Sequence, residues 1–92
     1  MPVLSPTQID QQLGSLPAWR VEAGELVRTF TFADFLSAMR FVNRVADAAE
    51  TAGHHPDIDI RYNKVRLALV THSAGGLTEM DFALAGAADK LT

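Results

Sequence analysis

The 92-residue sequence contains no cysteine. This excludes disulfides and thiolate metal sites and fits a reducing compartment, so we expect a cytoplasmic location. Basic residues are fewer than acidic ones. The sequence has eight Lys and Arg and eleven Asp and Glu, which gives a formal net charge of −3. Since nucleic-acid binding needs a cationic face, we expect no direct contact with nucleic acid. No apolar run reaches the ~18–20 residues of a membrane helix, so we expect no membrane partner.

The length predicts one small domain spanning residues 1–92. Its composition is that of a folded protein, with 48% hydrophobic and 21% charged residues. The first ten residues show no basic stretch followed by an apolar one, which predicts that no signal peptide is present. A domain of this size has a thin core, so burial between subunits would stabilise it.

The first half of the sequence predicts a short helix over 6–13, strands over 19–21 and 26–32, and a helix over 33–52. The prediction of the long helix is based on apolar residues that recur at spacings of four, three, four and three: Phe35, Met39, Val42, Ala46 and Ala49. Ser5 is expected to cap the first helix. Thr31 or Asp34 would cap the long helix, and Gly53 would end it.

Two further strands are predicted over 57–62 and 65–72, joined by the tight turn Asn63-Lys64. With this turn, Ile60 faces Leu67 and His55 faces His72. Directly opposed residues have Cβ atoms about 4.5–5.5 Å apart. The two imidazoles are therefore expected to be neighbours at the open end of the hairpin.

A last helix is predicted over 79–88, because Thr78 followed by Asp81 resembles a capping box. The complete order is β-β-α-β-β-α with a short helix in front. Antiparallel strands with helices segregated to one side make an α+β domain. We therefore expect a single domain with a four-stranded antiparallel sheet and helices packed on one face.

Several polar residues with fixed spacings lie around the second hairpin. In sequence order they are Glu50, His54, His55, Pro56, Tyr62, His72 and Asp81. Three residues separate Glu50 from His54, and eight separate His72 from Asp81. These residues and spacings resemble the signature of the pterin-4a-carbinolamine dehydratase family, and the resemblance covers roughly residues 5–91.

The resemblance implies a lyase that dehydrates 4a-hydroxytetrahydropterin to quinonoid dihydropterin and water, with tetrahydrobiopterin recycling as the family's best-known setting. The hydroxyl on C4a must be protonated as it leaves, and a base must remove the proton on N5. Imidazole, with an unperturbed pKa of about 6.5, can do either near neutral pH. Neither a metal nor any other cofactor is implied.

The catalytic residues implied are His54, His55 and His72. We expect His54 and His72 to be the acid and the base, and His55 to bind and orient the pterin. Five residues are expected to contribute to substrate binding. Backbone groups of Pro56, Thr71 and Ser73 would line the pterin ring, and Glu50 or Asp57 would orient an imidazole. Asp81 is a further carboxylate that could reach the histidines, and the stronger expectation is that it supports the cap of the last helix, where a carboxylate is favourable.

Two other functions stay open. The three histidines with a carboxylate would suit a zinc site. Alternatively, the chain is a non-catalytic binding, dimerisation or assembly module, since the family includes a dimerisation cofactor of a transcription factor and assembly factors. The resemblance also implies a homodimer or homotetramer. Candidate interface residues, chosen for apolar character, are Phe41, Leu84 and Ala88.

Overall fold

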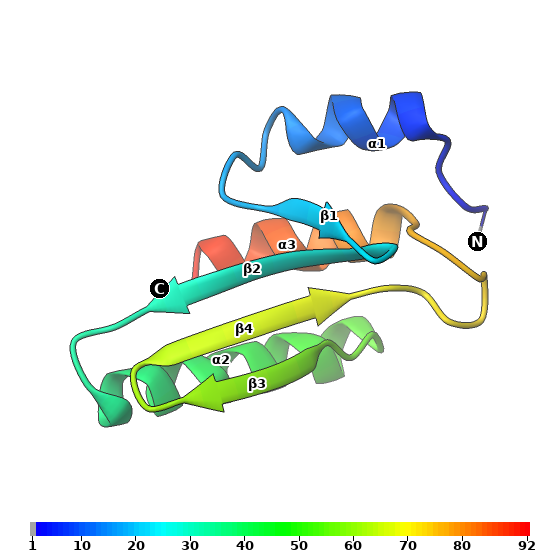
Figure 1. Cartoon of the computed structure of the whole chain (residues 1–92). Coiled ribbons are helices and arrows are strands. Elements are labelled where there is room, and N and C mark those ends of the chain that lie inside the picture. The colour runs from blue at the N-terminus through cyan, green and yellow to red at the C-terminus, as the bar shows by residue number, and fades with distance from the viewer. Residues whose placement is uncertain (1) are drawn as a thin grey trace.

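The computed structural model describes residues 2–92 (Figure 1). Its elements are α1 (Pro6–Leu13), β1 (Arg20–Glu22), β2 (Glu25–Thr31), α2 (Phe35–Ala52), β3 (Asp57–Arg61), β4 (Lys64–Leu69) and α3 (Glu79–Asp89). The predicted α+β order is confirmed, and most boundaries agree within one or two residues. Within residues 2–92, no helix is long and apolar enough to cross a membrane.

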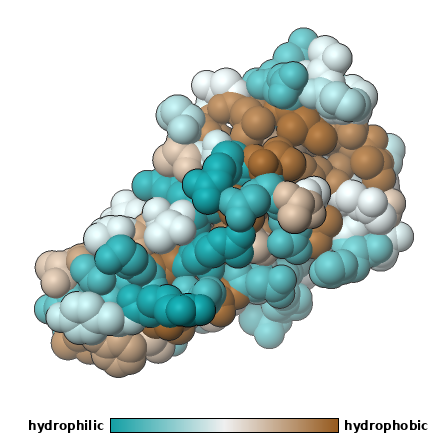
Figure 2. Space-filling view, in the orientation of Figure 1, coloured by the Kyte–Doolittle hydropathy of each residue, from teal (hydrophilic) through white to brown (hydrophobic). Residues whose placement is uncertain are grey.

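The four strands form one antiparallel sheet in the order β1-β2-β4-β3. Figure 1 shows α2 and α3 behind the sheet, so these helices cover one face as predicted. The central strands bury a row of side chains toward them: Leu26, Phe30, Val65, Leu67 and Leu69. The opposite face is polar at its centre (Figure 2), where Arg66 pairs with Glu22 at 3.6 Å.

The long helix α2 buries a different stripe from the predicted one. Its buried residues are Ala38, Phe41, Val45 and Ala49, whereas Phe35 is half exposed and Ala46 is exposed. The predicted helix is confirmed, but only Ala49 belongs both to the predicted apolar stripe and to the buried one. Phe41 and Val45 are bulky enough to fill the space under the sheet. The helix is therefore rotated about its axis relative to the prediction.

The second hairpin pairs in a register two residues away from the predicted one. Arg61 pairs with Lys64, so the turn is Tyr62-Asn63 instead of Asn63-Lys64. Tyr62 takes the left-handed conformation with φ 52°. The Asn63 side chain donates a hydrogen bond of 2.9 Å to the Phe32 carbonyl oxygen, and the Phe32 N–H donates one of 2.9 Å to the Asn63 carbonyl oxygen. These contacts hold the turn one residue earlier than expected.

The predicted pairing of His55 with His72 is therefore wrong. The β3–β4 ladder runs only from Asp57↔Ala68 to Arg61↔Lys64, so neither histidine belongs to it. Because the register shift is an even number of residues, the apolar face of the hairpin is unchanged, and Ile58 now lies opposite Leu67.

Asp34 is the residue that caps α2, and its carboxylate accepts a hydrogen bond of 2.8 Å from the Ser37 N–H. This bond lowers the pKa of Asp34. A carboxyl group with a lowered folded pKa stabilises the fold above its unfolded pKa, and that contribution is lost as the pH falls through the folded value. Asp34→Asn keeps a good cap without the titration.

We therefore expect the wild type to lose more stability than Asp34→Asn when the pH is lowered from about 6 to about 3, through the carboxylate range. Urea unfolding midpoints at several pH values measure this. Parallel pH profiles for the two proteins would contradict it.

Candidate active site

His54 enters the site from the end of α2. Gly53 takes the left-handed conformation with φ 64° after the last helical turn, which reverses the chain. The His54 N–H then donates to the Ala49 carbonyl oxygen at 3.1 Å. The side chain of His54 is buried, with the residue only 9% exposed. The C-terminal turn of α2 thus directs one imidazole into the protein.

Asp81 is the partner of this imidazole. Its Oδ1 lies 2.5 Å from Nε2 of His54, and the carboxylate is fully buried. Its other oxygen, Oδ2, accepts hydrogen bonds of 2.9 Å from the Thr71 hydroxyl and from the Thr78 N–H. The bond from Thr78 completes the predicted capping box of α3, which is confirmed. Asp81 therefore caps a helix and holds a histidine at the same time.

Two buried threonines complete the network. Since the Thr71 hydroxyl hydrogen goes to Asp81, the Thr78 hydroxyl donates to Oγ1 of Thr71, 2.8 Å away. Oγ1 of Thr78 in turn accepts from the Met80 N–H at 3.2 Å. Among residues 2–92, every buried side-chain nitrogen and oxygen has a partner. A fully satisfied buried network of this kind favours one arrangement of its members.

His55 points to solvent, unlike its neighbour. Its Nε2 lies 3.5 Å from Oε2 of Glu50, and both side chains are mostly exposed. Of the two acids expected to orient an imidazole, Glu50 therefore lies beside one. Asp57 is the exposed first residue of β3, opposite Ala68, and Pro56 is half buried.

His72 lies in a tight loop beyond β4. It follows Thr71, which forms a bridge with Gly76 that closes the loop. His72 and Ser73 are both exposed. Because Thr71 contacts Asp81 and Asp81 contacts His54, the network brings the His54-His55 segment and the His72 loop to one region. The convergence predicted for these segments therefore comes from α3 and not from strand pairing.

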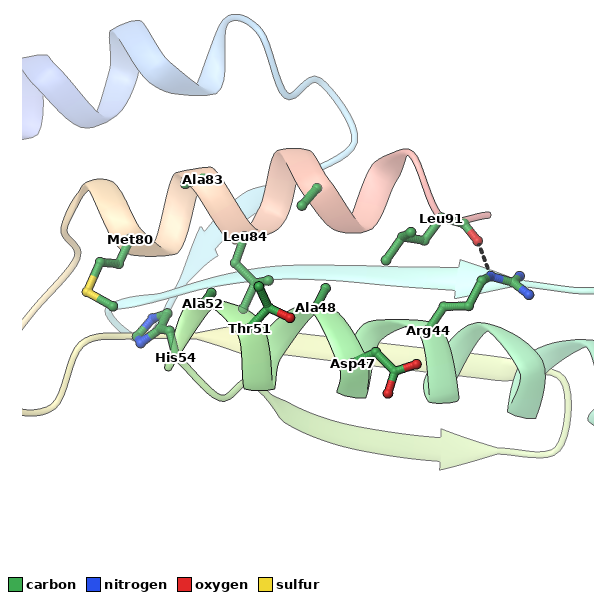
Figure 3. A pocket seen from close by; sticks show the side chains of 11 residues that line it. Arg44, Asp47, Ala48, Thr51, Ala52, His54, Met80, Ala83, Leu84 and Leu91 are labelled. Carbon is green, nitrogen blue, oxygen red and sulfur yellow. Dashed lines mark hydrogen bonds between the residues drawn. The ribbon is translucent and has the colours of Figure 1, made fainter.

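A groove of about 750 Å³ runs between α2 and α3 (Figure 3). His54 and Met80 lie at one end, and Arg44 and Leu91 at the other, where Arg44 Nε donates to the Leu91 carbonyl oxygen at 2.8 Å. Most of the lining between them is apolar: Ala48, Ala52, Ala83, Leu84 and Ala87. The groove thus contains one of the three histidines.

The expected interface residues lie mainly in the core. Phe41 is 0% and Ala88 1% exposed, so neither offers a surface. Leu84 is also buried, although it lines the groove. The apolar surface between the helices comes instead from smaller residues of the groove. The residue types show which positions are apolar, but they do not show which face of a helix is exposed.

No three His, Cys, Asp or Glu side chains of residues 2–92 are grouped so that they could hold a metal ion. The three-histidine zinc site considered from the sequence therefore has no geometric support.

The sequence placed Asp81 among the carboxylates that could reach the histidines, but it did not identify His54 as the specific partner. The capping box accounted for the residue, and 27 positions separate it from His54. One signal was available, because the box has Asp where Glu or Gln is usual. The shorter side chain keeps its carboxylate close to the backbone, where Thr71 and His54 reach it.

Comparison with known proteins adds to this geometry. Residues 2–91 match the sequence profile of the family described as pterin 4 alpha carbinolamine dehydratase. Relatives named after pterin-4-alpha-carbinolamine dehydratase in Acidobacterium capsulatum and Chloroflexus aurantiacus are each 62% identical over 91 residues. The match covers 99% of this chain in both cases, and 99% and 98% of the respective relatives.

Two solved structures share the fold. One, described as a transcriptional coactivator/pterin dehydratase from Brucella melitensis, has a TM-score of 0.92 and 33% identity over 97% of both chains. The other, described as a pterin dehydratase-like RuBisCO assembly factor of the alpha-carboxysome, has a TM-score of 0.65 and 24% identity. It covers 79% of this chain and 84% of its own, and it shows the shared fold alone.

Proposed function

Because the chain belongs to the pterin-4-alpha-carbinolamine dehydratase family, we propose that it converts 4a-hydroxytetrahydropterin into quinonoid dihydropterin and water. The C4a–O bond breaks, and the hydroxyl leaves as water after it receives a proton. N5 loses its proton, and the electron pair of the N–H bond forms the new double bond to C4a. One proton enters and one leaves the substrate, so the enzyme needs one acid and one base.

The buried pair of His54 and Asp81 is the observation that carries this proposal. An ionised carboxylate only accepts hydrogen bonds, so Nε2 of His54 must carry the hydrogen between them. Nδ1 is then the nitrogen that can take up a proton. Because Asp81 is held by Thr71 and Thr78, the imidazole keeps one tautomer and one orientation. These are the properties of a positioned base, and positioned proton transfer contributes about 10²–10⁴-fold to a rate.

His72 is the second proton-transfer group of the proposal, and His55 binds and orients the pterin. The exposed ring of His72 can exchange protons with water between turnovers. Oε2 of Glu50, 3.5 Å from Nε2 of His55, is placed to orient that ring. The Thr71 hydroxyl donates to Asp81, and the Thr71 N–H and carbonyl oxygen form hydrogen bonds within the loop, so Thr71 supports the pterin site while backbone groups of Pro56 and Ser73 line it.

The activity is tested with 4a-hydroxytetrahydropterin generated by an aromatic amino acid hydroxylase, the setting of tetrahydrobiopterin recycling. Absorbance should show the intermediate decaying faster in proportion to the amount of protein added. A decay rate that is independent of the protein would argue for a non-catalytic binding or assembly module instead.

Self-association as a homodimer or homotetramer is the second part of the proposal. The apolar groove between α2 and α3 is the surface that supports it. A charge placed there should separate the subunits, because burying it unpaired is unfavourable. We expect Ala83→Glu to lower the mass measured by sedimentation, and Ala46→Glu, on an exposed part of α2 outside the groove, to leave it unchanged. Equal masses for all three proteins would place any interface elsewhere.

A further inference from the structure

The ring of His72 differs from those of His54 and His55 in what surrounds it. His54 is held by Asp81, and His55 lies beside Glu50. Within residues 2–92, the His72 ring has no hydrogen-bond or ion-pair partner. Its position is therefore set by the backbone of the loop that carries it.

That loop is short and closed at its base. The Thr71 N–H donates to the Gly76 carbonyl oxygen at 3.1 Å, and the Gly76 N–H donates back at 3.4 Å. Within the loop, the Gly75 N–H donates to the carbonyl oxygens of Thr71 and His72 at 3.0 and 3.1 Å, and Gly75 has φ 79°. The Thr71 side of the base is fixed by Asp81. The Gly76 side continues into Leu77, which is buried in the core.

The N-terminal strap, residues 2–5, contacts this side of the loop. Figure 1 shows it at the same end of the molecule as the loop between β4 and α3. The Leu4 N–H donates to the Leu77 carbonyl oxygen at 2.8 Å, and the Leu4 side chain is buried in the core. Beyond the strap, Gln12 of α1 donates to Glu79 of α3 at 2.6 Å. The chain that follows Val3 is thus attached to Leu77 and to α3 by one hydrogen bond each.

Val3 lies directly against Gly76. A Cβ atom added at Gly76 would be only 3.0 Å from Cγ1 of Val3, closer than an ordinary contact. Gly76 is not one of the glycines with positive φ. Space next to Val3, and not backbone conformation, is therefore what favours glycine here.

We propose that the N-terminal strap, through Val3 and Leu4, is a positioning element that holds the His72 loop in its working place. This rests on the proposed function, in which His72 transfers a proton. Val3 and Leu4 touch no reacting atom and act only through Gly76 and Leu77. Since a misplacement of 1 Å can cost about 10²-fold in rate, a displacement of a few tenths of an ångström should be measurable.

The test introduces a steric clash between residue 76 and Val3 and then removes it with a second substitution. Gly76→Ala should lower kcat about three- to tenfold because the proton-transfer group shifts, and KM should rise as well because the same loop carries the Ser73 backbone groups proposed to bind the pterin. Adding Val3→Ala removes the crowding, so Val3→Ala/Gly76→Ala should recover kcat to within about twofold of wild type. Gly86→Ala on α3, where an added Cβ meets nothing within 4 Å, is the matched control and should behave as wild type.

Ring resonances of the histidines, measured by NMR, separate this inference from the proposed function. In Gly76→Ala the His72 ring signals should shift and the His54 signals should stay, and the double variant should restore the His72 signals. If the wild type has no dehydratase activity, the proposed function fails, and the ring signals still decide the role of the strap. Unshifted His72 signals in Gly76→Ala, or a double variant that restores neither signals nor kcat, would overturn it.

Discussion

Replacing Asp81 by asparagine should lower kcat about 10³- to 10⁴-fold while the protein stays folded, as expected when a catalytic imidazole is held in the wrong tautomer. The Thr71 hydroxyl and the Thr78 N–H both donate to Oδ2, so the amide oxygen of asparagine should take that side. Its NH₂ group then faces His54. Nε2 must become an acceptor, which moves the ring hydrogen to Nδ1 and removes the base.

The ¹⁵N chemical shifts of the His54 ring report the tautomer directly. We expect the hydrogen on Nε2 in wild type and on Nδ1 in Asp81→Asn, with Asp10→Asn on the exposed face of α1 as a control that changes nothing. Asp81→Ala should instead lose about 3–5 kcal/mol of stability, because it breaks a buried pair and removes a helix cap. A fully active Asp81→Asn would show that the carboxylate serves only the fold.

Replacing His54 by glutamine should abolish most activity at little cost in stability. The amide nitrogen of glutamine can donate to Oδ1 of Asp81 as Nε2 does, but it cannot accept and release a proton near neutral pH. We expect kcat to fall about 10²–10⁴-fold, the usual contribution of a general acid or base. His54→Ala should lose the same activity and, in addition, stability, because it leaves a buried carboxylate oxygen without a partner.

Thermal unfolding of the two variants separates catalysis from structure. His54→Gln should melt near wild type and His54→Ala clearly below it. His72→Ala is the complementary case, since its exposed ring has no partner among residues 2–92, and it should melt like wild type while losing activity. If His54→Gln retains wild-type turnover, His54 has no part in proton transfer.

The order and bounds of the elements were predictable because their signals are local. Ser5 and Asp34 cap helices, Gly53 ends one, and Thr78 with Asp81 starts another. The predictions that were wrong, the hairpin register and the buried side of α2, concern features that depend on contacts between distant segments. The turn moved by one residue because Asn63 bonds with Phe32, 31 positions away. The buried stripe of α2 depends on which side chains fit beneath the sheet.

The sequence predicted the residues of the candidate site, but the geometry predicted for them, with His55 opposite His72, was wrong. His54, His55 and His72 stood out by spacing, and their catalytic role stays a prediction. Their environments differ strongly, since His54 is buried and the other two are exposed. Nothing local in the sequence distinguishes His54 from His55. The difference arises because the left-handed turn at Gly53 directs the first ring toward Asp81.

The most direct test is the dehydration rate of 4a-hydroxytetrahydropterin with wild type and His54→Gln/His72→Ala measured side by side. Both substitutions are expected to preserve the fold, so a difference reports on proton transfer. We predict rapid loss of the intermediate with wild type and only the uncatalysed rate with the double variant. Equal rates with the two proteins would contradict histidine acid–base catalysis at this site.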